Sequence, residues 1–595
     1  MLKSKLNDSW TESMKIRKVL FSVCFSLAFT MIGADAAGNT IRVGSEIAYV
    51  QTDRDIYIAG ESIFFKLYLV DAGSHKLSGI SKIAYLVLRN AASTSIAQIK
   101  LKVEDGMAYG SIYLPDSLKS GVYQVCAFSN WMRNAGEESF FTKEIFIANR
   151  FDRDLDEINS YTSSIKSISD TLRNRDGQKP VQLATDKTEY GKRELIKLSL
   201  KFSPEISADS AVLSITVSED VPGLNDYFTI GNYLQMNALE LAGNQMVAHS
   251  NYRFLPEHNG EIVQGKVIDH DSKADVGGLN VFLSAADTLV NLQYGVTDSA
   301  GVFRFQLTDY YYGKDLYFSI KDIPEGKRLE IITEDKFELK TRFNPSQNQE
   351  NPFLKDYILK SQDIVTVQKI YETTVAWKES NPFKPDISGP WLYYKPSYRI
   401  YPADFVPLND FVEMSKEIIP PQLNLRKRNN QYTASMADEN LHLYMDQEPA
   451  IFLDGVMIND VNPFIELGSD KVERVELVCS RYNCGDLVFP GILAVFSKNF
   501  EIRNIRPNAS TLRWQPGTFH PYSNYVSQNY AYENTVNRPD FRQLLFCNPA
   551  ISISTGHSIT TEFYASDHSG NYSIRVEGIT SGGVAVSAGT RVTIR

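Results

Sequence analysis

The sequence predicts a mainly β protein in which several β-sandwich domains follow one another and one small α+β domain is added. The 595 residues include 32 Tyr and 32 Phe, residue types that are enriched in strands. Short stretches of alternating apolar residues recur along the chain, and one motif occurs twice in its first half. A chain of this length is expected to hold about four domains.

The motif that occurs twice places Thr, Asp, a basic residue, Tyr, Glu and Ile at the same offsets. Its copies are Thr52–Ile63 and Thr185–Ile196, and an alternating apolar stretch follows each copy, at 64–70 and at 198–202. This spacing predicts one sandwich that is repeated, each copy entered through a turn into its strand.

The first copy resembles the macroglobulin-like domains of bacterial surface proteins, with the patterns T-D-[KR]-x-x-Y-x-x-G-E and L-P-x-x-L-x-x-G-x-Y. The second pattern spans Leu114–Tyr123, and Asn130–Asn134 follows, as in envelope members of that family. The resemblance implies macroglobulin-like (immunoglobulin-like) sandwiches at residues 38–150 and 181–258. We interpret three aromatic residues of these segments as structural, packed in the core or at a corner: Tyr57, Tyr123 and Trp131.

A third module is expected at residues 259–340. Its segments 262–269, 277–283 and 295–305 carry the patterns G-x-V-x-D, G-x-x-V-x-L and T-D-x-x-G-x-F-x-F. They resemble the carboxypeptidase regulatory-like β-sandwich, in which Thr-Asp-x-x-Gly makes a tight hairpin turn. That fold carries no catalysis in itself, and such modules commonly precede plug domains.

Residues 450–496 resemble the plug of a TonB-dependent outer-membrane receptor. The plug has a strand with x-x-D-G-x-x-I, then a helix, an x-V-E-x-V-E-V strand and a G-x-I-x-V strand. We expect a plug-like domain at 396–500 without the transporter barrel, which needs several hundred residues. Asp454 and Gly455 are interpreted as a structural turn in which glycine takes a positive φ, with no catalytic role for the aspartate.

The remaining segments are interpreted as linkers and a closing domain. Polar stretches predict linkers at 151–180 and 341–395. Residues 501–595 resemble the closing domain of the same envelope proteins and are expected to form a C-terminal β-sandwich. Alternation at Tyr572 and Ile574 predicts a half-buried strand there. The second linker is expected to hold a short amphipathic helix, predicted from residues near helical spacing: Tyr357, Ile364, Val367, Ile370 and Tyr371.

Residues 1–37 have the pattern of a secretory signal peptide. Basic residues precede a short apolar run at 19–32, and an A-x-A cleavage site follows at 34–36. The apolar run is short for a membrane span, and no later stretch reaches the roughly 18 apolar residues of a spanning helix. We expect an exported protein that is associated with the outer membrane, periplasmic or at the cell surface.

No catalytic, cofactor or metal site is predicted. The 8 His include no H-E-x-x-H and no ligand pair at metal spacing. Cys484-Gly485-Asp486 resembles part of the macroglobulin thioester, but Leu487 stands where the glutamine belongs, so no thioester can close. Cys479 and Cys484 are expected either to form a disulfide across a turn or to remain free.

Two functions remain open. The formal charge of −10 argues against nucleic acid as the main partner. The order of modules resembles envelope proteins of the Bacteroides group. It implies a non-enzymatic accessory protein whose plug-like domain docks to a transporter, another outer-membrane protein or an envelope complex. The alternative is a surface adhesin or a protein that binds a polymer or glycan. The sequence identifies no small-molecule ligand.

Overall fold

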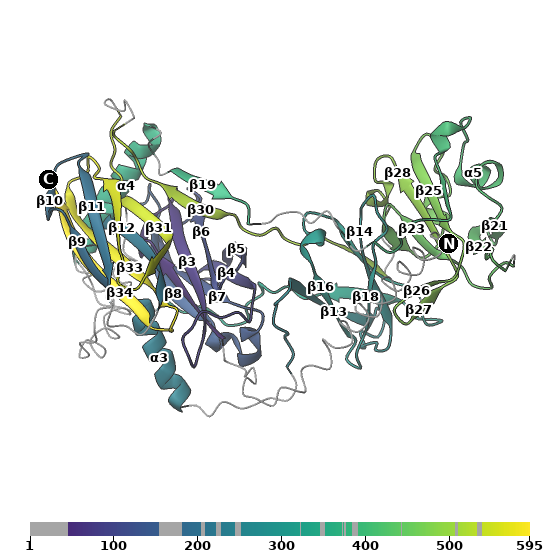
Figure 1. Ribbon diagram of the computed structural model, residues 1–595, viewed down its shortest axis with the longest axis horizontal. Helices are drawn as coiled ribbons and strands as arrows, with labels where there is room; N and C mark the ends of the chain where they lie inside the picture. The colour runs from purple at the N-terminus through teal and green to yellow at the C-terminus, as the bar shows by residue number, and fades with distance from the viewer. Residues whose placement is uncertain are drawn as a thin grey trace, which may run out of the picture.

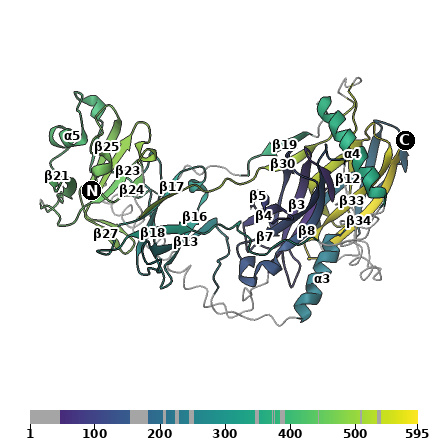
Figure 2. The same ribbon diagram turned by 180° about the vertical axis from the view of Figure 1, so that it is seen from behind.

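The computed structural model has two lobes (Figure 1), and the view from behind shows the same division (Figure 2). One lobe holds two β-sandwiches, and the other holds a third sandwich and an α+β module. The protein is mainly β, which confirms the predicted fold class. The predicted signal peptide (1–37) and nearly all of the linker at 151–180 lie outside the described residues. The structure describes residues 46–153, 181–203, 209–221, 228–243, 252–321, 323–345, 352–371, 373, 376–382, 389, 391–441, 443–505, 510–531 and 538–595.

Sandwich 1 (residues 46–148) consists of a three-stranded and a five-stranded sheet. Their strand orders are β1-β3-β6 and β2-β8-β7-β4-β5. Strand β2 pairs in parallel with β8, and apolar side chains from both sheets fill one core. The strands are β1 (Glu46–Thr52), β2 (Ile56–Ile58), β3 (Ser62–Asp71), β4 (Ile83–Asn90), β5 (Ser95–Lys102), β6 (Met107–Tyr113), β7 (Gly121–Phe128) and β8 (Phe141–Ala148).

Sandwich 2 repeats this topology strand for strand, but two distant parts of the chain build it. Its sheets have the orders β32-β11-β9 and β10-β34-β33-β12-β31. These orders match sandwich 1 when β9–β12 replace β1–β4 and β31–β34 replace β5–β8. The strands are β9 (Val181–Thr185), β10 (Glu189–Tyr190), β11 (Leu195–Phe202), β12 (Ser210–Glu219), β31 (Leu544–Ser554), β32 (Ser558–Tyr564), β33 (Gly570–Thr580) and β34 (Ala585–Ile594).

This pairing corrects the domains predicted at 181–258 and 501–595, which are largely two halves of one sandwich. Strand β12 pairs with β33 on one side and with β31 on the other. Residues 220–543 are therefore an insert between its fourth and fifth strands. The N–H of Glu219 donates to the carbonyl of Gln543 at 2.8 Å, so the insert leaves and returns at neighbouring points. Periodicity identifies strands but not their partners, so no local pattern indicates this closure.

The motif that occurs twice folds into the same corner in both sandwiches. In the first copy, the Asp53 carboxylate accepts from the Tyr57 hydroxyl and from the backbone N–H eleven residues later, both at 2.8 Å. In the second, Asp186 accepts from Tyr190 at 2.8 Å and from the equivalent N–H at 2.9 Å. The motif glutamate binds the basic residue and a backbone N–H in both copies. The repeat in the sequence thus corresponds to a repeat in topology.

A second corner is also shared. Tyr123 and Tyr572 each stand two residues after the glycine that begins the seventh strand of their sandwich. Each hydroxyl donates to the backbone carbonyl four residues upstream, at 2.8 Å and 3.2 Å. Such tyrosine corners are typical of immunoglobulin-like sandwiches. The structure therefore places Tyr123 at a corner.

The two sandwiches pack through sheet faces that carry buried polar side chains. The Tyr49 hydroxyl donates to Glu577 at 2.8 Å, and Arg575 donates to the backbone carbonyl of Asp53. Strand β33, predicted to be half-buried, is buried on both faces because Arg575 and Glu577 lie against sandwich 1. Burial also raises the pKa of Glu577. It lowers the pKa of Lys66, which lies 3.5 Å from the carbonyl of Leu213 on β12, to about 7.

The first described helix of the insert is α3 (Ile230–Gly243), which packs on both sandwich 1 and β34 of sandwich 2, and the insert continues into sandwich 3. The sheets of sandwich 3 have the orders β16-β13-β18 and β15-β14-β17-β29. The last strand, β29 (Thr511–Trp514), comes from the predicted C-terminal domain and lies outside the module predicted at 259–340. The other strands are β13 (Glu261–Asp269), β14 (Asn280–Ala285), β15 (Gln293–Val296), β16 (Val302–Leu307), β17 (Leu316–Ile320) and β18 (Leu329–Thr333).

A buried cluster of charges joins sandwich 3 to sandwich 1. Lys100 of β5 forms an ion pair with Glu261 of β13 at 2.6 Å. Lys336 pairs with Glu257 at 2.6 Å, and the Tyr85 hydroxyl of β4 lies 3.0 Å from the Glu257 carboxylate. Leaving any one of these buried charges unpaired costs several kcal/mol, on the order of 3–5. The cluster therefore restricts how the two sandwiches meet.

The α+β module (residues 398–503) has one sheet of order β20-β25-β28-β23-β24. Helix α5 and the β21–β22 hairpin share a core with one face, and the other face packs on sandwich 3. The elements are β20 (Tyr398–Ile400), α5 (Phe411–Glu417), β21 (Leu423–Arg428), β22 (Gln431–Met436), β23 (Ala450–Leu453), β24 (Val456–Ile458), β25 (Val472–Val478), β26 (Tyr482–Cys484), β27 (Leu487–Phe489) and β28 (Ile492–Ser497).

Two further elements of the insert return to the first lobe. Helix α4 (Pro352–Ile370) confirms the predicted helix and packs on sandwich 1. Ile370 and Tyr371, predicted on its apolar face, are exposed because the shared core extends only to Val365. Strands β19 (Ala376–Ser380) and β30 (Tyr522–Val526) pair as a ribbon. None of the helices in the described ranges is long and apolar enough to cross a membrane.

We predict that sandwich 2 folds as one unit without its insert. Residues 181–219 joined to 544–595 through the β4–β5 turn (91–94) supply all eight strands and should unfold cooperatively. Residues 181–258 alone lack four strands, leave an apolar sheet face uncovered and should not fold. Thermal unfolding followed by circular dichroism tests both chains. A cooperative transition for residues 181–258 alone would contradict the shared sandwich.

We also predict that Lys66→Met stabilises the protein at pH 7. The folded state lowers the pKa of Lys66 to about 7, whereas the unfolded chain keeps it near 10.5. Between these values the unfolded chain binds more protons, so wild-type stability rises with pH. The advantage of the variant, about 1 kcal/mol or more at pH 7, should shrink towards pH 9. Denaturant unfolding at both pH values measures it. Lys378→Met, on exposed β19, should show no such pH dependence.

Candidate functional site

The Asp454-Gly455 pair forms the turn between β23 and β24 in the α+β module. Asp454 has a φ of 50° and Gly455 a φ of 81°, so the glycine takes the positive value that was predicted. Two consecutive residues with positive φ are typical of the tight turns that join antiparallel strands. The pair therefore forms the turn between two strands that the sequence predicts.

The Asp454 carboxylate is buried and holds the module together. It accepts hydrogen bonds from the backbone N–H and hydroxyl of Ser497 at 2.6 Å and 2.8 Å, and from the N–H of Ile502 at 3.1 Å. Burial raises the pKa of Asp454, although these hydrogen bonds act in the opposite direction. Because these bonds fix the end of β28, the carboxylate has the environment of a structural group.

The same turn joins the module to sandwich 3. The N–H of Asp287 donates to the carbonyl of Asp454 at 2.9 Å. A Cβ added to Gly455 would lie 2.6 Å from the carbonyl oxygen of Leu289 and 2.9 Å from that of Asp287. Only glycine fits this approach of two backbones. The turn therefore positions the module on its neighbour, a role that the sequence motif did not reveal.

Both cysteines considered for a disulfide are free in the structure. Cys479 is buried at the end of β25, and burial raises the pKa of its thiol to about 11. Cys484 begins the tight turn of the β26–β27 hairpin, in which Gly485 has a φ of 59°. Raised pKa values disfavour the thiolate, which is the reactive form of cysteine.

Trp131 belongs to a segment that joins sandwich 1 to the insert. Its ring is buried against Tyr252, with centroids 4.8 Å apart. Asn134 donates to the carbonyl of Phe254 at 2.7 Å, and Arg133 forms an ion pair with Glu334 at 2.7 Å. Tyr57, Tyr123 and Trp131 thus lie in three separate structural settings within sandwich 1 and do not form a site.

One exposed feature of the α+β module lies along its β21–β22 hairpin and the following loop. We name it the hairpin surface. Leu441 and Leu443 are 64% and 67% exposed. The basic side chains are exposed and have no ion pair among the described residues. The hairpin lies at the end of the molecule farthest from sandwich 2 in both views (Figure 1; Figure 2). The hairpin surface comprises Arg426, Lys427, Arg428, Leu441, Leu443 and Tyr444.

The hairpin surface has no recognisable pattern in the sequence. A run of three basic residues in a hairpin usually indicates a solvated strand end, and leucines in a short loop have no periodicity. Tyr444 is placed by its hydroxyl, which donates to the carbonyl of Pro421 at 2.8 Å, and by a backbone bridge to Ala437. Only the fold places the loop beside the hairpin.

A second exposed apolar pair, Phe405 and Val406, follows β20 in the same module. It lies near the start of β25, whereas the loop of Leu443 lies near the end of that strand. The module therefore has two separate exposed apolar loops. The loop of Leu443 lies at the open end of the β21–β22 hairpin, and the cations lie at the turn end of the same hairpin.

The described residues show no arrangement for metal chemistry. Among them, no group of three His, Cys, Asp or Glu side chains is placed to hold a metal ion. The hairpin surface combines apolar contact area with positive charge. These two features serve association with another molecule.

No protein-family model and no curated protein matches the sequence. Among solved structures, Escherichia coli alpha-2-macroglobulin activated by porcine elastase is similar over 92% of this chain and 44% of its own, at 9% identity and TM-score 0.24. Salmonella alpha-2-macroglobulin reacted with methylamine is similar over 94% and 40%, at 10% identity and TM-score 0.24. This chain thus spans less than half the length of these proteins. Beta-glucosidase from Listeria innocua covers 19% of this chain, at 11% identity and TM-score 0.13. TM-scores this low carry no argument about the fold. The architecture therefore follows only from the strand pairing in this protein.

We predict that Gly455→Val destabilises the protein by about 2 kcal/mol or more, since it combines backbone strain with a clash against two carbonyl groups. Gly278 is a matched control, because it has a φ of 76° but, among the described residues, no heavy atom beyond its chain neighbours lies within 4 Å of the position that an added Cβ would take. The loss of unfolding free energy in Gly278→Val should therefore come from the backbone strain alone. Denaturant unfolding of both variants measures the difference. Equal losses would show that the contact of Gly455 with sandwich 3 contributes nothing.

Proposed function

We propose that this protein is a non-enzymatic component of the cell envelope that docks to an outer-membrane partner through its α+β module. The resemblance of residues 450–496 to a receptor plug motivates the location and the class of partner. The hairpin surface supplies the contact. The single observation that carries the proposal is that one hairpin of this module exposes cations at its turn and apolar side chains in the loop at its open end.

The chemistry of the hairpin surface favours a macromolecular partner. Arg426, Lys427 and Arg428 form a local positive cluster on a chain whose formal net charge is −10. Such a cluster attracts an acidic surface at long range, and desolvated leucines then stabilise the contact. Exposed apolar side chains rimmed by polar ones mark protein interaction sites.

The architecture also favours binding over chemistry. The aspartates of the sequence motifs make structural hydrogen bonds. Asp53 and Asp186 do so in corners, and Asp454 does so in the turn on sandwich 3. The sandwiches then serve as a support that holds the α+β module at one end of the molecule (Figure 1). A docking protein needs such a support and needs no reactive group.

We predict that Leu441→Asp/Leu443→Asp abolishes crosslinking to an outer-membrane protein in native membranes. The two carboxylates remove the apolar contact and oppose an acidic partner, so the crosslinked yield should fall about tenfold or more. Phe405→Asp/Val406→Asp is the matched control, because it makes the same change on the other exposed loop of this module and should keep the crosslink. Mass spectrometry of the crosslinked peptides reports both.

Raising the salt concentration provides an independent check. Association that depends on the cationic hairpin should weaken with ionic strength, because salt screens exposed charges. If the Leu441→Asp/Leu443→Asp protein keeps every membrane contact while circular dichroism shows it folded, the hairpin surface is not the docking site.

A further inference from the structure

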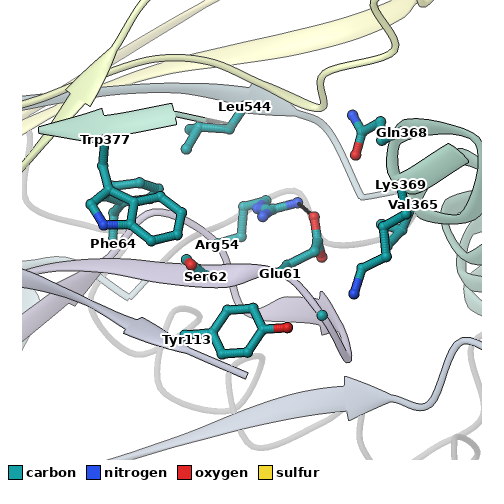
Figure 3. Close-up of a pocket in the computed structure, with 11 residues that line it drawn as sticks. Arg54, Glu61, Ser62, Phe64, Tyr113, Val365, Gln368, Lys369, Trp377 and Leu544 are labelled. Atoms are coloured by element: carbon teal, nitrogen blue, oxygen red, sulfur yellow. Dashed lines mark hydrogen bonds and ion pairs between the residues drawn. The ribbon is translucent and has the colours of Figure 1, made fainter. Parts of the chain in front are cut away.

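A pocket of about 310 Å³ lies in the other lobe, where the insert returns to sandwich 1 (Figure 3). Its walls come from segments that are far apart in the sequence: the β2–β3 corner, the end of α4, strand β19 and the start of β31. The volume is at the lower end of the roughly 300–1,000 Å³ of small-molecule sites. The pocket exists only because α4 and β19 lie over the first sandwich.

Aromatic rings form one side of the pocket (Figure 3). Trp377 of β19 is 37% exposed, and Tyr113 at the end of β6 is 53% exposed. Phe64 is buried beneath Trp377 and meets it edge to face, with ring centroids 6.4 Å apart, so the indole has a fixed support. Two accessible rings beside one cavity offer apolar faces to a ligand.

Polar groups also line the pocket, with Gln368 opposite the rings and Ser62 beside Phe64 (Figure 3). Gln368 of α4 is only 6% exposed and lines the pocket, and its side-chain amide makes no hydrogen bond to another described residue. The hydroxyl of Ser62 also lines the pocket without a described partner. An amide that lines a pocket without a protein partner is available to a ligand or to water. It can both donate and accept.

The charges around the pocket are neutralised by one another. Arg54 forms ion pairs with Asp53 and Glu61, both at 3.1 Å. Lys369 forms an ion pair with Asp116 at 2.6 Å. An anionic or cationic ligand would have to break one of these pairs. The site therefore favours an uncharged ligand that carries hydrogen-bonding groups and an apolar face.

We propose that this pocket binds a neutral carbohydrate, with one sugar ring against Trp377 and Tyr113 and its hydroxyl groups bound by Gln368 and Ser62. The C–H face of a pyranose is apolar and its rim is rich in hydroxyls, which matches rings on one side of the pocket and an amide on the other. This site is separate from the hairpin surface, so the proposal does not rest on the docking function. The pocket would be the sugar-binding site of the glycan-binding alternative that the sequence left open.

The test is saturation-transfer difference NMR of the full chain with cellobiose, maltose and N,N′-diacetylchitobiose as probes. At least one disaccharide should receive saturation on its ring protons and show saturable binding. Trp377→Ala should weaken that binding about tenfold or more, a typical loss for one stacked aromatic contact. Gln368→Leu, which keeps the side-chain volume but removes the amide, should also weaken it.

Trp391→Ala is the matched control, because Trp391 is an exposed tryptophan in the other lobe, bridged by its backbone to Asn291. Its sugar binding should equal that of the unmodified protein. The proposal is overturned if none of the three disaccharides binds, or if binding survives Trp377→Ala in a protein of unchanged melting temperature. Displacement of the bound sugar by tri-alanine, with tighter binding of that peptide, would overturn it in favour of a peptide pocket. The membrane crosslinks of the Trp377→Ala protein should persist, which separates this site from the hairpin surface.

Discussion

The architecture depends on one strand, β12, whose hydrogen-bonding partners come from the other end of the chain. On one side it pairs with β33 and on the other with β31, so sandwich 2 cannot close until residues beyond 543 are present. The insert leaves after Glu219 and returns before Leu544, on adjacent strands. Neighbouring ends let a large segment be inserted without strain on the host sheet, as at sites where domain insertion is tolerated. The closure anchors both ends of the insert on sandwich 2.

Buried polar contacts then fix how the units sit together. Between sandwiches 1 and 2, Glu577 accepts from Tyr49 and from the N–H of Ile230, the first residue of α3. Burial raises the pKa of Glu577 and of Glu257, the buried carboxylate beside sandwich 3. Apolar surfaces would tolerate sliding, whereas a buried charge is stable only when its partners are in place. These contacts contribute little net stability but define the relative position of the sandwiches.

The structure thus holds two proposed binding regions, one in each lobe. The hairpin surface on the α+β module exposes cationic and apolar side chains and is proposed to contact a large partner. The pocket between Trp377 and Gln368 is concave and its charges are paired, and it suits a small neutral ligand. A protein that holds a membrane partner at one end and a sugar at the other would connect an envelope complex to a glycan. The rigid sandwiches would set the distance between them.

The sequence by itself determined the local structure. Period-two alternation located strands such as β3 and β11, helical spacing located α4, and Asp454-Gly455 marked a turn with positive φ. The repeated motif identified two equivalent corners, because each of its polar residues binds within a dozen residues of itself. Only the tertiary structure decided which strands share a sheet, because the pairing of β12 with β33 spans hundreds of residues and leaves no periodic trace. It also decided the burial of both faces of β33, and it brought Phe64, Gln368 and Trp377 to one pocket. Those outcomes depend on packing between distant segments, which no local pattern encodes.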